Sequence, residues 1–270
     1  MAAKAIALNI ILAALSLAPS GRQAVADDPI RCTILMDVDS GATRLREGTC
    51  DRPVYPMSTF KLPLAVMGYD AGILVDAKTP LWSYQASFDR PKRERKATDP
   101  TIWERDSIVW YSQEVTRRLG KAAFENYVRR LDYGNRDVSS GPGKLDGLTG
   151  AWLMASLKIS PDQQVDFVRR LLKGELPVSA EAVENTRAIM PVFKAGNGWE
   201  IHGKTGSGWL RNTAGKIDRA RPLGWFVGWA QKDGQEIAFA RLFIDTVPHA
   251  DPISLTTRDS LIADFAGLMP

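Results

Sequence analysis

The sequence has few of the residues on which many catalytic sites depend. Its 270 residues include only two histidines, His202 and His249, and only two cysteines, Cys32 and Cys50. A Ser-His-Asp triad would have to use one of these histidines, and neither lies in an elbow or loop pattern associated with that role. A catalytic serine in this chain is therefore expected to use a different base.

Apolar runs long enough to cross a membrane are also lacking. The run from Ala5 to Ala18 falls short of the ~20 residues that a spanning helix needs. Lys4 precedes this run, and Ala24-Val25-Ala26 matches an A-x-A cleavage site. Residues 1–26 are therefore predicted to be a secretory signal peptide, and residues 27–270 to be an exported protein that is free of the membrane after cleavage.

An excess of charge of one sign is absent as well. Removing Lys4 and Arg22 from the 35 basic residues leaves 33, against 31 acidic residues. The basic cluster at residues 92–96 has no interleaved aromatic residues and lies beside Asp89, Glu94 and Asp99. It is interpreted as a solvated loop, and no nucleic-acid partner is expected.

The two cysteines both lie early in the exported part of the chain. Because an exported protein meets oxidising conditions, Cys32 and Cys50 are expected to form a disulfide, with two free thiols as the alternative.

The pattern of apolar and turn residues predicts an α+β fold in a single domain over residues 27–270. The terminal segments are expected to build one antiparallel sheet, with a helical lobe inserted between them. The expected strands are 30–37, 43–46, 199–204, 224–230 and 237–244. The expected helices are one beginning at Ser58 and ending by Gly72, and others at 106–119, after Ser160, at 179–190 and at 258–268. Residues 76–100 are expected to be loop.

Ser58-Thr59-Phe60-Lys61 is the first segment with a chemical signature. On a helix, residues three apart lie on one face, so the Ser58 hydroxyl and the Lys61 amine would be neighbours. Burial against the following apolar residues would lower the pKa of the lysine toward the neutral amine that a base requires. An isolated match of this kind is usually only a helix cap, and other motifs must support it.

Two later segments support the first. Ser107-Ile108-Val109 is expected at the start of a helix. Lys204-Thr205-Gly206 is expected at the end of a strand, where a substrate could lie along the backbone. Each match is weak alone, but the three in this order form a stronger pattern.

Further segments extend the match over nearly the whole exported chain. The complete set is Ser58-Thr-Phe-Lys61, Ser107-Ile-Val109 with Trp110-Tyr-Ser-Gln-Glu114, Tyr133-Gly134-Asn135, Trp152 before Ile159-Ser160, Lys204-Thr-Gly206 and Gly224-Trp-Phe-Val-Gly-Trp229. With these motifs the sequence resembles the class D serine β-lactamases, or oxacillinases. The Ser-Asp-Asn motif of class A is replaced by Ser-x-Val.

The resemblance implies the β-lactamase/transpeptidase-like fold and a role for each matching residue. Ser58 would attack the β-lactam carbonyl and form an acyl-enzyme. Lys61 would react with carbon dioxide, and the resulting carboxylate would be the general base. The indole N–H of Trp152 would stabilise that carboxylate, Ser107 would relay a proton to the leaving nitrogen, and Val109 would help to exclude water.

Substrate contacts are implied for the later motifs. The backbone N–H groups of Ser58 and Ser207 would form an oxyanion hole. Lys204, Thr205 and Gly206 would bind the substrate, with Arg258 assisting at its carboxylate. No metal and no cofactor beyond carbon dioxide or bicarbonate is implied, and the location would be the bacterial periplasm.

Other readings remain open at this point. A penicillin-sensing or penicillin-binding domain would be acylated without turnover, and an exported serine esterase would use the same residues on another substrate. Tyr133-Gly134-Asn135 is interpreted as a turn, and Trp225 and Trp229 as core residues. The sequence does not decide between a monomer and a homodimer, nor what the segment 207–223 contributes.

Overall fold

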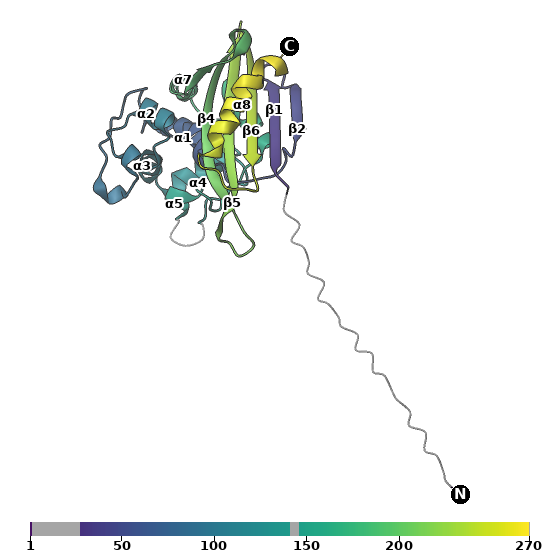
Figure 1. Ribbon diagram of the computed structural model, residues 1–270. Helices are drawn as coiled ribbons and strands as arrows, with labels where there is room; N and C mark the ends of the chain where they lie inside the picture. Colours follow the sequence, from purple (N-terminus) through teal and green to yellow (C-terminus); the bar gives the residue numbers. More distant parts are fainter. Residues whose placement is uncertain (2–27, 141–145, 270) are drawn as a thin grey trace.

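Six strands form one antiparallel sheet in the computed structural model, which describes Met1 and residues 28–140 and 146–269 (Figure 1). Their order across the sheet is β2-β1-β6-β5-β4-β3. The bounds are β1 Ile30–Asp37, β2 Thr43–Gly48, β3 Val192–Lys194, β4 Glu200–Arg211, β5 Ile217–Lys232 and β6 Gln235–Ile244. The N-terminal hairpin thus pairs with the C-terminal strands, as the α+β prediction requires. The signal-peptide prediction lies outside the described residues.

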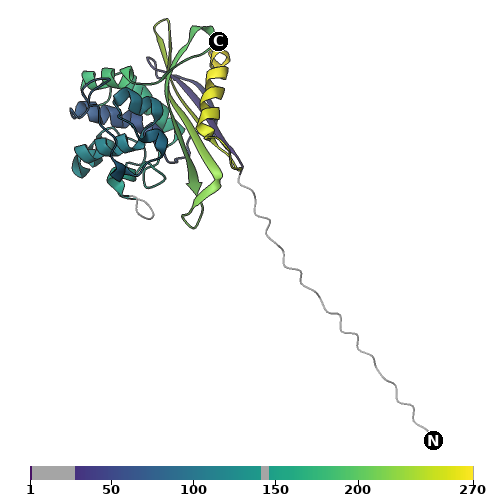
Figure 2. The same cartoon turned by 60° about the vertical axis from the view of Figure 1, so that its left-hand side comes forward.

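Helices cover both faces of the sheet. Figure 2 shows the helical lobe on one face and the C-terminal helix α8 on the other. The α-helices are α1 Lys61–Asp70, α2 Pro100–Asp106, α3 Val109–Leu119, α4 Lys121–Arg130, α5 Gly147–Gly150, α6 Pro161–Leu172, α7 Ala180–Ala188 and α8 Ile253–Leu268. Short 3₁₀ turns are η1 Met57–Phe60, η2 Ala86–Phe88, η3 Lys92–Glu94 and η4 Gly196–Gly198.

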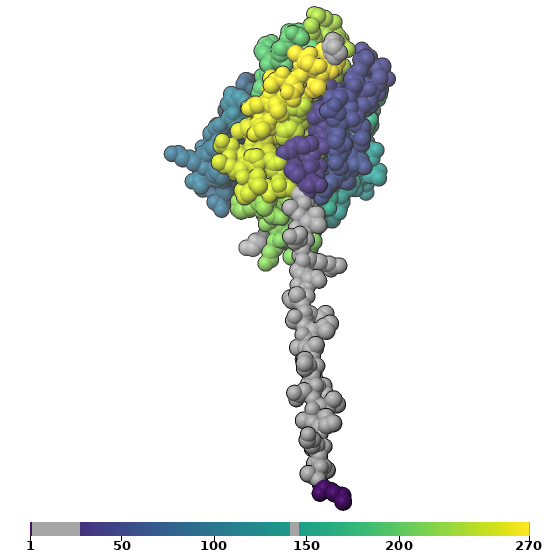
Figure 3. All heavy atoms as spheres, turned by 45° about the vertical axis from the view of Figure 1, so that its right-hand side comes forward, coloured from purple at the N-terminus to yellow at the C-terminus, as the bar shows by residue number. Residues whose placement is uncertain are grey.

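The sheet separates two hydrophobic cores. Successive side chains of a strand point to opposite faces. In β5, Trp225 and Trp229 accordingly pack toward the helical lobe, whereas Phe226 packs under α8 with Leu261 and Phe265. In Figure 3, α8 lies beside the first hairpin on the outer face. The interpretation of the two tryptophans as core residues is confirmed.

Several local predictions are confirmed. Cys32 and Cys50 form a disulfide that links β1 to the segment after β2, with 5.1 Å between their Cα atoms. Ser160 and Gln163 form the capping box that opens α6. In the Tyr133-Gly134-Asn135 turn, Gly134 has φ of 58° and packs against the Lys158 carbonyl, where a side chain would clash.

The helix expected over 106–119 is present and ends at Leu119 as predicted, but it begins three residues later than expected. α2 ends at Asp106, and α3 begins at Val109. Ser107 lies between them in the left-handed region, with φ of 56°. The Glu94 carboxylate accepts a hydrogen bond from Val109 N at 2.9 Å, and this distant group caps α3.

Other predicted bounds were too short or placed wrongly. Lys204-Thr205-Gly206 lies in the middle of β4 rather than at a strand end, and most of the segment 207–223 extends the β4–β5 hairpin. α8 begins at Ile253, five residues before the predicted start, and α4 was not predicted. α2 was also missed, although Asp99 caps it and Pro100 occupies its first position.

Candidate active site

Ser58 lies in the 3₁₀ turn η1, directly before the buried helix α1. Two buried hydrogen bonds of Thr59 stabilise the turn. Its Oγ1 donates to the Pro56 carbonyl at 2.7 Å and accepts from Gln164 Nε2 at 2.9 Å. The residue before Ser58, Met57, has φ of 53°, a strained conformation for a residue with a side chain. Ser58 itself is half-buried and faces a cavity. The fold therefore fixes one serine hydroxyl at the cavity wall.

Lys61 lies one turn after Ser58 and is only 1% exposed. Burial, reinforced by the charge of Lys204, lowers the pKa of the Lys61 amine to about 7. Its Nζ has no hydrogen-bond partner among the described residues. A buried amine without partners is costly to retain, and sites of this kind are often functional.

Strand β4 passes close to the Ser58 turn, and Gly206 makes this approach possible. A Cβ atom on Gly206 would lie 2.9 Å from the Pro56 carbonyl oxygen and 3.2 Å from Ser58 N. β3 is only three residues long and pairs with β4 no further than His202. Beyond that point the edge of β4 faces the helical lobe, and Thr205 and Ser207 line the cavity there.

The buried Lys204 side chain contacts Ser107, a residue of the cavity lining. Lys204 is 2% exposed, and its Nζ donates to Ser107 Oγ and to the Thr205 carbonyl, each at 3.1 Å. Burial lowers the pKa of Lys204, while the Glu104 carboxylate opposes that shift. An ammonium group is thus bonded to a serine hydroxyl that lines the cavity.

The cavity has a volume of about 760 Å³ and gathers residues from distant parts of the chain. It is lined by five of the residues predicted from sequence: Ser58, Ser107, Val109, Thr205 and Ser207. Three arginines also line it: Arg90, Arg93 and Arg211. The site therefore combines a nucleophile, three further hydroxyls and a positive wall suited to an anionic substrate.

Trp152 packs behind the nucleophile turn. Its indole stacks on Phe60 with ring centroids 5.1 Å apart, and its carbonyl accepts from Met57 N at 3.1 Å. It is 1% exposed. The tryptophan therefore adjoins the segment that carries both Ser58 and Lys61.

Comparisons with known proteins agree with this geometry. Residues 18–257 match the family model described as the penicillin binding protein transpeptidase domain. β-Lactamase OXA-9 of Klebsiella pneumoniae is 45% identical over 90% of this chain and 89% of its own. β-Lactamase OXA-1 of Escherichia coli is 35% identical over 77% and 74%.

The crystal structure of the class D β-lactamase OXA-427 superposes with a TM-score of 0.80 at 43% identity, covering 88% of this chain and 96% of the other. The chain belongs to the class D β-lactamases. Its transpeptidase-like fold is that of the family, as the sequence resemblance predicted.

One residue that the β-lactamase resemblance assigns to substrate binding lies away from the cavity. Arg258 does not line it. Its guanidinium pairs with Asp259 at 2.7 Å and lies over the ring of Phe193, 5.3 Å from the centroid. Ser254, one turn earlier in α8, lies at the cavity and accepts from Ser207 Oγ at 2.5 Å.

Sequence reasoning missed two buried acids beside this β-lactamase site, Glu94 and Glu104. Glu94 lies in the basic cluster that was interpreted as a solvated loop, yet it is fully buried and bonds Arg90 and Arg93. Glu104 is also fully buried. Both acids lie in strongly charged segments, which are usually exposed, so no local signal marked them.

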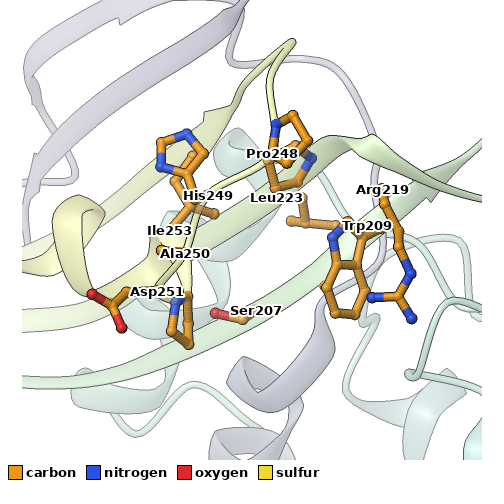
Figure 4. A pocket seen from close by; sticks show the side chains of 12 residues that line it. Ser207, Trp209, Arg219, Leu223, Pro248, His249, Ala250, Asp251 and Ile253 are labelled. Atoms are coloured by element: carbon orange, nitrogen blue, oxygen red, sulfur yellow. The ribbon is translucent and has the colours of Figure 1, made fainter.

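A smaller cavity of about 330 Å³, whose lining residues Figure 4 shows, shares part of its wall with the first. Ser207, Trp209 and Pro252 line both. Figure 4 shows Trp209 beside Arg219, whose guanidinium lies 5.0 Å from the centre of the indole ring. Trp209 thus forms part of the wall between the two spaces.

No group of three or more His, Cys, Asp or Glu side chains is arranged to hold a metal ion in residues 28–140 and 146–269. Over the same ranges, no helix has the length and apolar character needed to cross a bilayer.

Proposed function

We propose that this protein hydrolyses β-lactam antibiotics, penicillins and oxacillin-type compounds among them, through an acyl-enzyme on Ser58. The observation that carries the proposal is the buried Lys61 amine, three residues from Ser58, with a lowered pKa. The named relatives, OXA-9 and OXA-1, are β-lactamases. Their names support a β-lactam as the substrate.

In the acylation step, Ser58 Oγ attacks the β-lactam carbonyl carbon. The backbone N–H groups of Ser58 and Ser207 stabilise the oxyanion that develops, and the close approach of β4 at Gly206 supports this pairing. When the carbon–nitrogen bond breaks, Ser107 gives its proton to the ring nitrogen. The Lys204 ammonium, bonded to Ser107, supports this transfer by holding the hydroxyl in place and replacing its proton.

The base in this proposal is Lys61 carrying a carboxylate derived from carbon dioxide. The fit is supported by the orphaned Nζ, because a neutral amine is the form that reacts with carbon dioxide. Once attached, the carboxylate supplies a general base for acylation and for the deacylating water. In this proposal Trp152, which packs on Phe60 beside Lys61, would hold it through its indole N–H, and Val109 would shield it from bulk water.

Substrate binding is assigned to the edge of β4. Thr205 lines the cavity, the buried Lys204 adds positive charge beside it, and Gly206 would let the substrate lie close to the backbone. The arginines that line the cavity favour the carboxylate common to these antibiotics. Arg258 would join only through a rearrangement of its contact with Phe193.

The deciding experiment is a time course of penicillin hydrolysis by residues 27–270, with and without added bicarbonate. Sustained turnover that bicarbonate increases is expected, and Lys61→Ala should abolish it. Lys121→Ala, which removes an exposed lysine from α4, is the matched control and should keep full activity. Full activity of Lys61→Ala would refute the mechanism.

One alternative keeps support from the match to a penicillin-binding transpeptidase domain. A penicillin-binding or sensing protein would show one stoichiometric burst of acylation at Ser58 and then stop. The same time course separates the two functions.

We propose further that the protein is exported to the periplasm after removal of residues 1–26. The disulfide between Cys32 and Cys50 supports an oxidising compartment. Sequencing the N-terminus of the protein recovered from a periplasmic extract would test this directly.

A further inference from the structure

Glu104 is a buried acid that the proposed mechanism does not use. It lies on α2, three residues before Ser107, and is 0% exposed. In the described part of the chain, neither of its carboxylate oxygens has a hydrogen-bond partner. A carboxylate held in this way costs several kcal/mol, so a structural role alone does not account for it.

The neighbouring acid Glu94 shows what a structural buried carboxylate looks like. Glu94 is equally buried, but it accepts from the backbone N–H of Val109 and from the guanidinium groups of Arg90 and Arg93. Those bonds compensate for its burial. Glu104 has no such compensation, which marks it as a candidate functional group.

The charges around Glu104 belong to the active site. Burial raises the pKa of Glu104, and the charges of Lys204 on β4 and Lys61 on α1 lower it. The Glu104 carboxylate in turn raises the pKa of Tyr69 on α1. Charges near η3 also contribute: Glu94 raises and Arg90 lowers the pKa of Lys61, and Arg93 lowers the pKa of Lys204. Glu104 thus lies in one electrostatic cluster with both catalytic lysines.

We propose that Glu104 accepts the proton that Lys61 loses when its amine adds carbon dioxide, which keeps the charge of the buried cluster constant. This inference rests on the carboxylation of Lys61 in the proposed function. It assigns to Glu104 a role in preparing the base, without contact to the substrate.

The reaction balances in atoms and charge. The Lys61 nitrogen forms a bond to the carbon of CO₂, one N–H proton leaves, and the Glu104 carboxylate becomes a carboxylic acid. Before the reaction the cluster holds neutral Lys61, anionic Glu104 and cationic Lys204. Afterwards it holds an anion on Lys61, neutral Glu104 and cationic Lys204, so the net charge stays at zero.

Electrostatics favours this arrangement over one with two anions. Two carboxylates that share a buried site rarely ionise together, because each raises the pKa of the other. A new carboxylate on Lys61 would therefore hold the proton on Glu104. The proton need not be released to solvent, and carboxylation becomes less dependent on pH.

The number of protons released per CO₂ bound tests the inference. Carbon-13 NMR of the full exported chain with labelled bicarbonate would measure the fraction of carboxylated Lys61 against dissolved CO₂ at several pH values. In Glu104→Gln the proton must go to solvent, so one more proton is released than in the wild type. With each unit of pH, the CO₂ affinity of the variant should therefore increase by a factor ten times larger than the corresponding factor for the wild type.

Two further variants make this test independent of folding defects. Glu104→Asp retains an acid and should restore the wild-type pH slope even if its absolute affinity changes. Glu125→Gln removes a partly exposed acid from α4 and should behave as the wild type. Equal slopes in the wild type and Glu104→Gln would overturn the role of Glu104. No carboxylate signal in the wild type would overturn the proposed base together with it.

Discussion

The close approach of β4 to the nucleophile turn makes Gly206→Ala a sharp test of the active-site geometry. The added Cβ would lie 2.9 Å from the Pro56 carbonyl oxygen, 3.1 Å from Thr59 N and 3.2 Å from Ser58 N. Ordinary contact begins near 3.4 Å, so the strand and the turn must separate by about 0.5 Å. All three contacts are to backbone atoms, which cannot move aside as the end of a flexible side chain can.

The expected effect on catalysis follows from that displacement. Catalytic groups must be held within about 0.5 Å of their productive positions, and a misplacement of about 1 Å costs about 10²-fold in rate. We therefore expect Gly206→Ala to lower kcat by about tenfold to a hundredfold, equivalent to about 1.4 to 2.7 kcal/mol in the activation free energy. Initial rates with a chromogenic cephalosporin, at saturating substrate and bicarbonate, would measure it.

A control in α8 separates geometry from the general effect of adding a methyl group. At Gly267, no described heavy atom outside its own helix and chain neighbours lies within 4 Å of the site of an added Cβ. Gly267→Ala should leave kcat unchanged and stabilise the helix by up to about 1 kcal/mol. An unchanged kcat in Gly206→Ala, with the protein folded by circular dichroism, would refute the proposed contact between β4 and the nucleophile turn.

Three further predictions concern the disulfide, pH and the cavity wall. Cys32→Ser with Cys50→Ser should lower the free energy of unfolding by about 3 kcal/mol, because the bridge closes a loop across 18 residues; equal denaturation midpoints would contradict this. Activity at fixed, limiting CO₂ should fall as pH drops below about 7, where the Lys61 amine becomes protonated and unreactive; initial rates would show it, and a flat profile into mildly acidic buffer would count against it. Trp209→Ala should join the two cavities and raise kcat/KM for bulky over small β-lactams by about tenfold, and an unchanged ratio would argue against this wall.

Features set by local interactions were predictable from the sequence. The capping box of α6 needs only Ser160 and Gln163, and both are visible in the chain. The spacing of Ser58 and Lys61 likewise places the two residues on neighbouring turns. The disulfide followed from the expected compartment and from the absence of any other cysteine.

Features that depend on distant contacts were not predictable. The start of α3 is fixed by the Glu94 carboxylate, which arrives from a segment that resembles an exposed basic loop. β4 continues through Gly206 and Gly208, although glycine usually weakens a strand. Both glycines are accommodated because the strand packs tightly against Met57 and the Ser58 turn. The glycines weaken the strand, but they allow the close approach to the Ser58 turn that the site requires.

The two buried acids should respond in opposite ways to the same substitution. Glu94→Gln weakens charge-assisted bonds to Val109 N and two arginines, so we expect the free energy of unfolding to fall by about 2 kcal/mol. Glu104→Gln is expected to change the free energy of unfolding in the opposite direction. Because its pKa is raised on folding, wild-type stability falls as pH rises above the unfolded value toward the raised one.

Glu104→Gln removes that loss and should be at least as stable as the wild type at neutral pH, while its uptake of CO₂ becomes more dependent on pH. Urea denaturation of both variants, beside the carbon-13 titration, would test the pair. A large destabilisation by Glu104→Gln would mean that the acid holds the fold together, and the division between a structural and a functional carboxylate would fail.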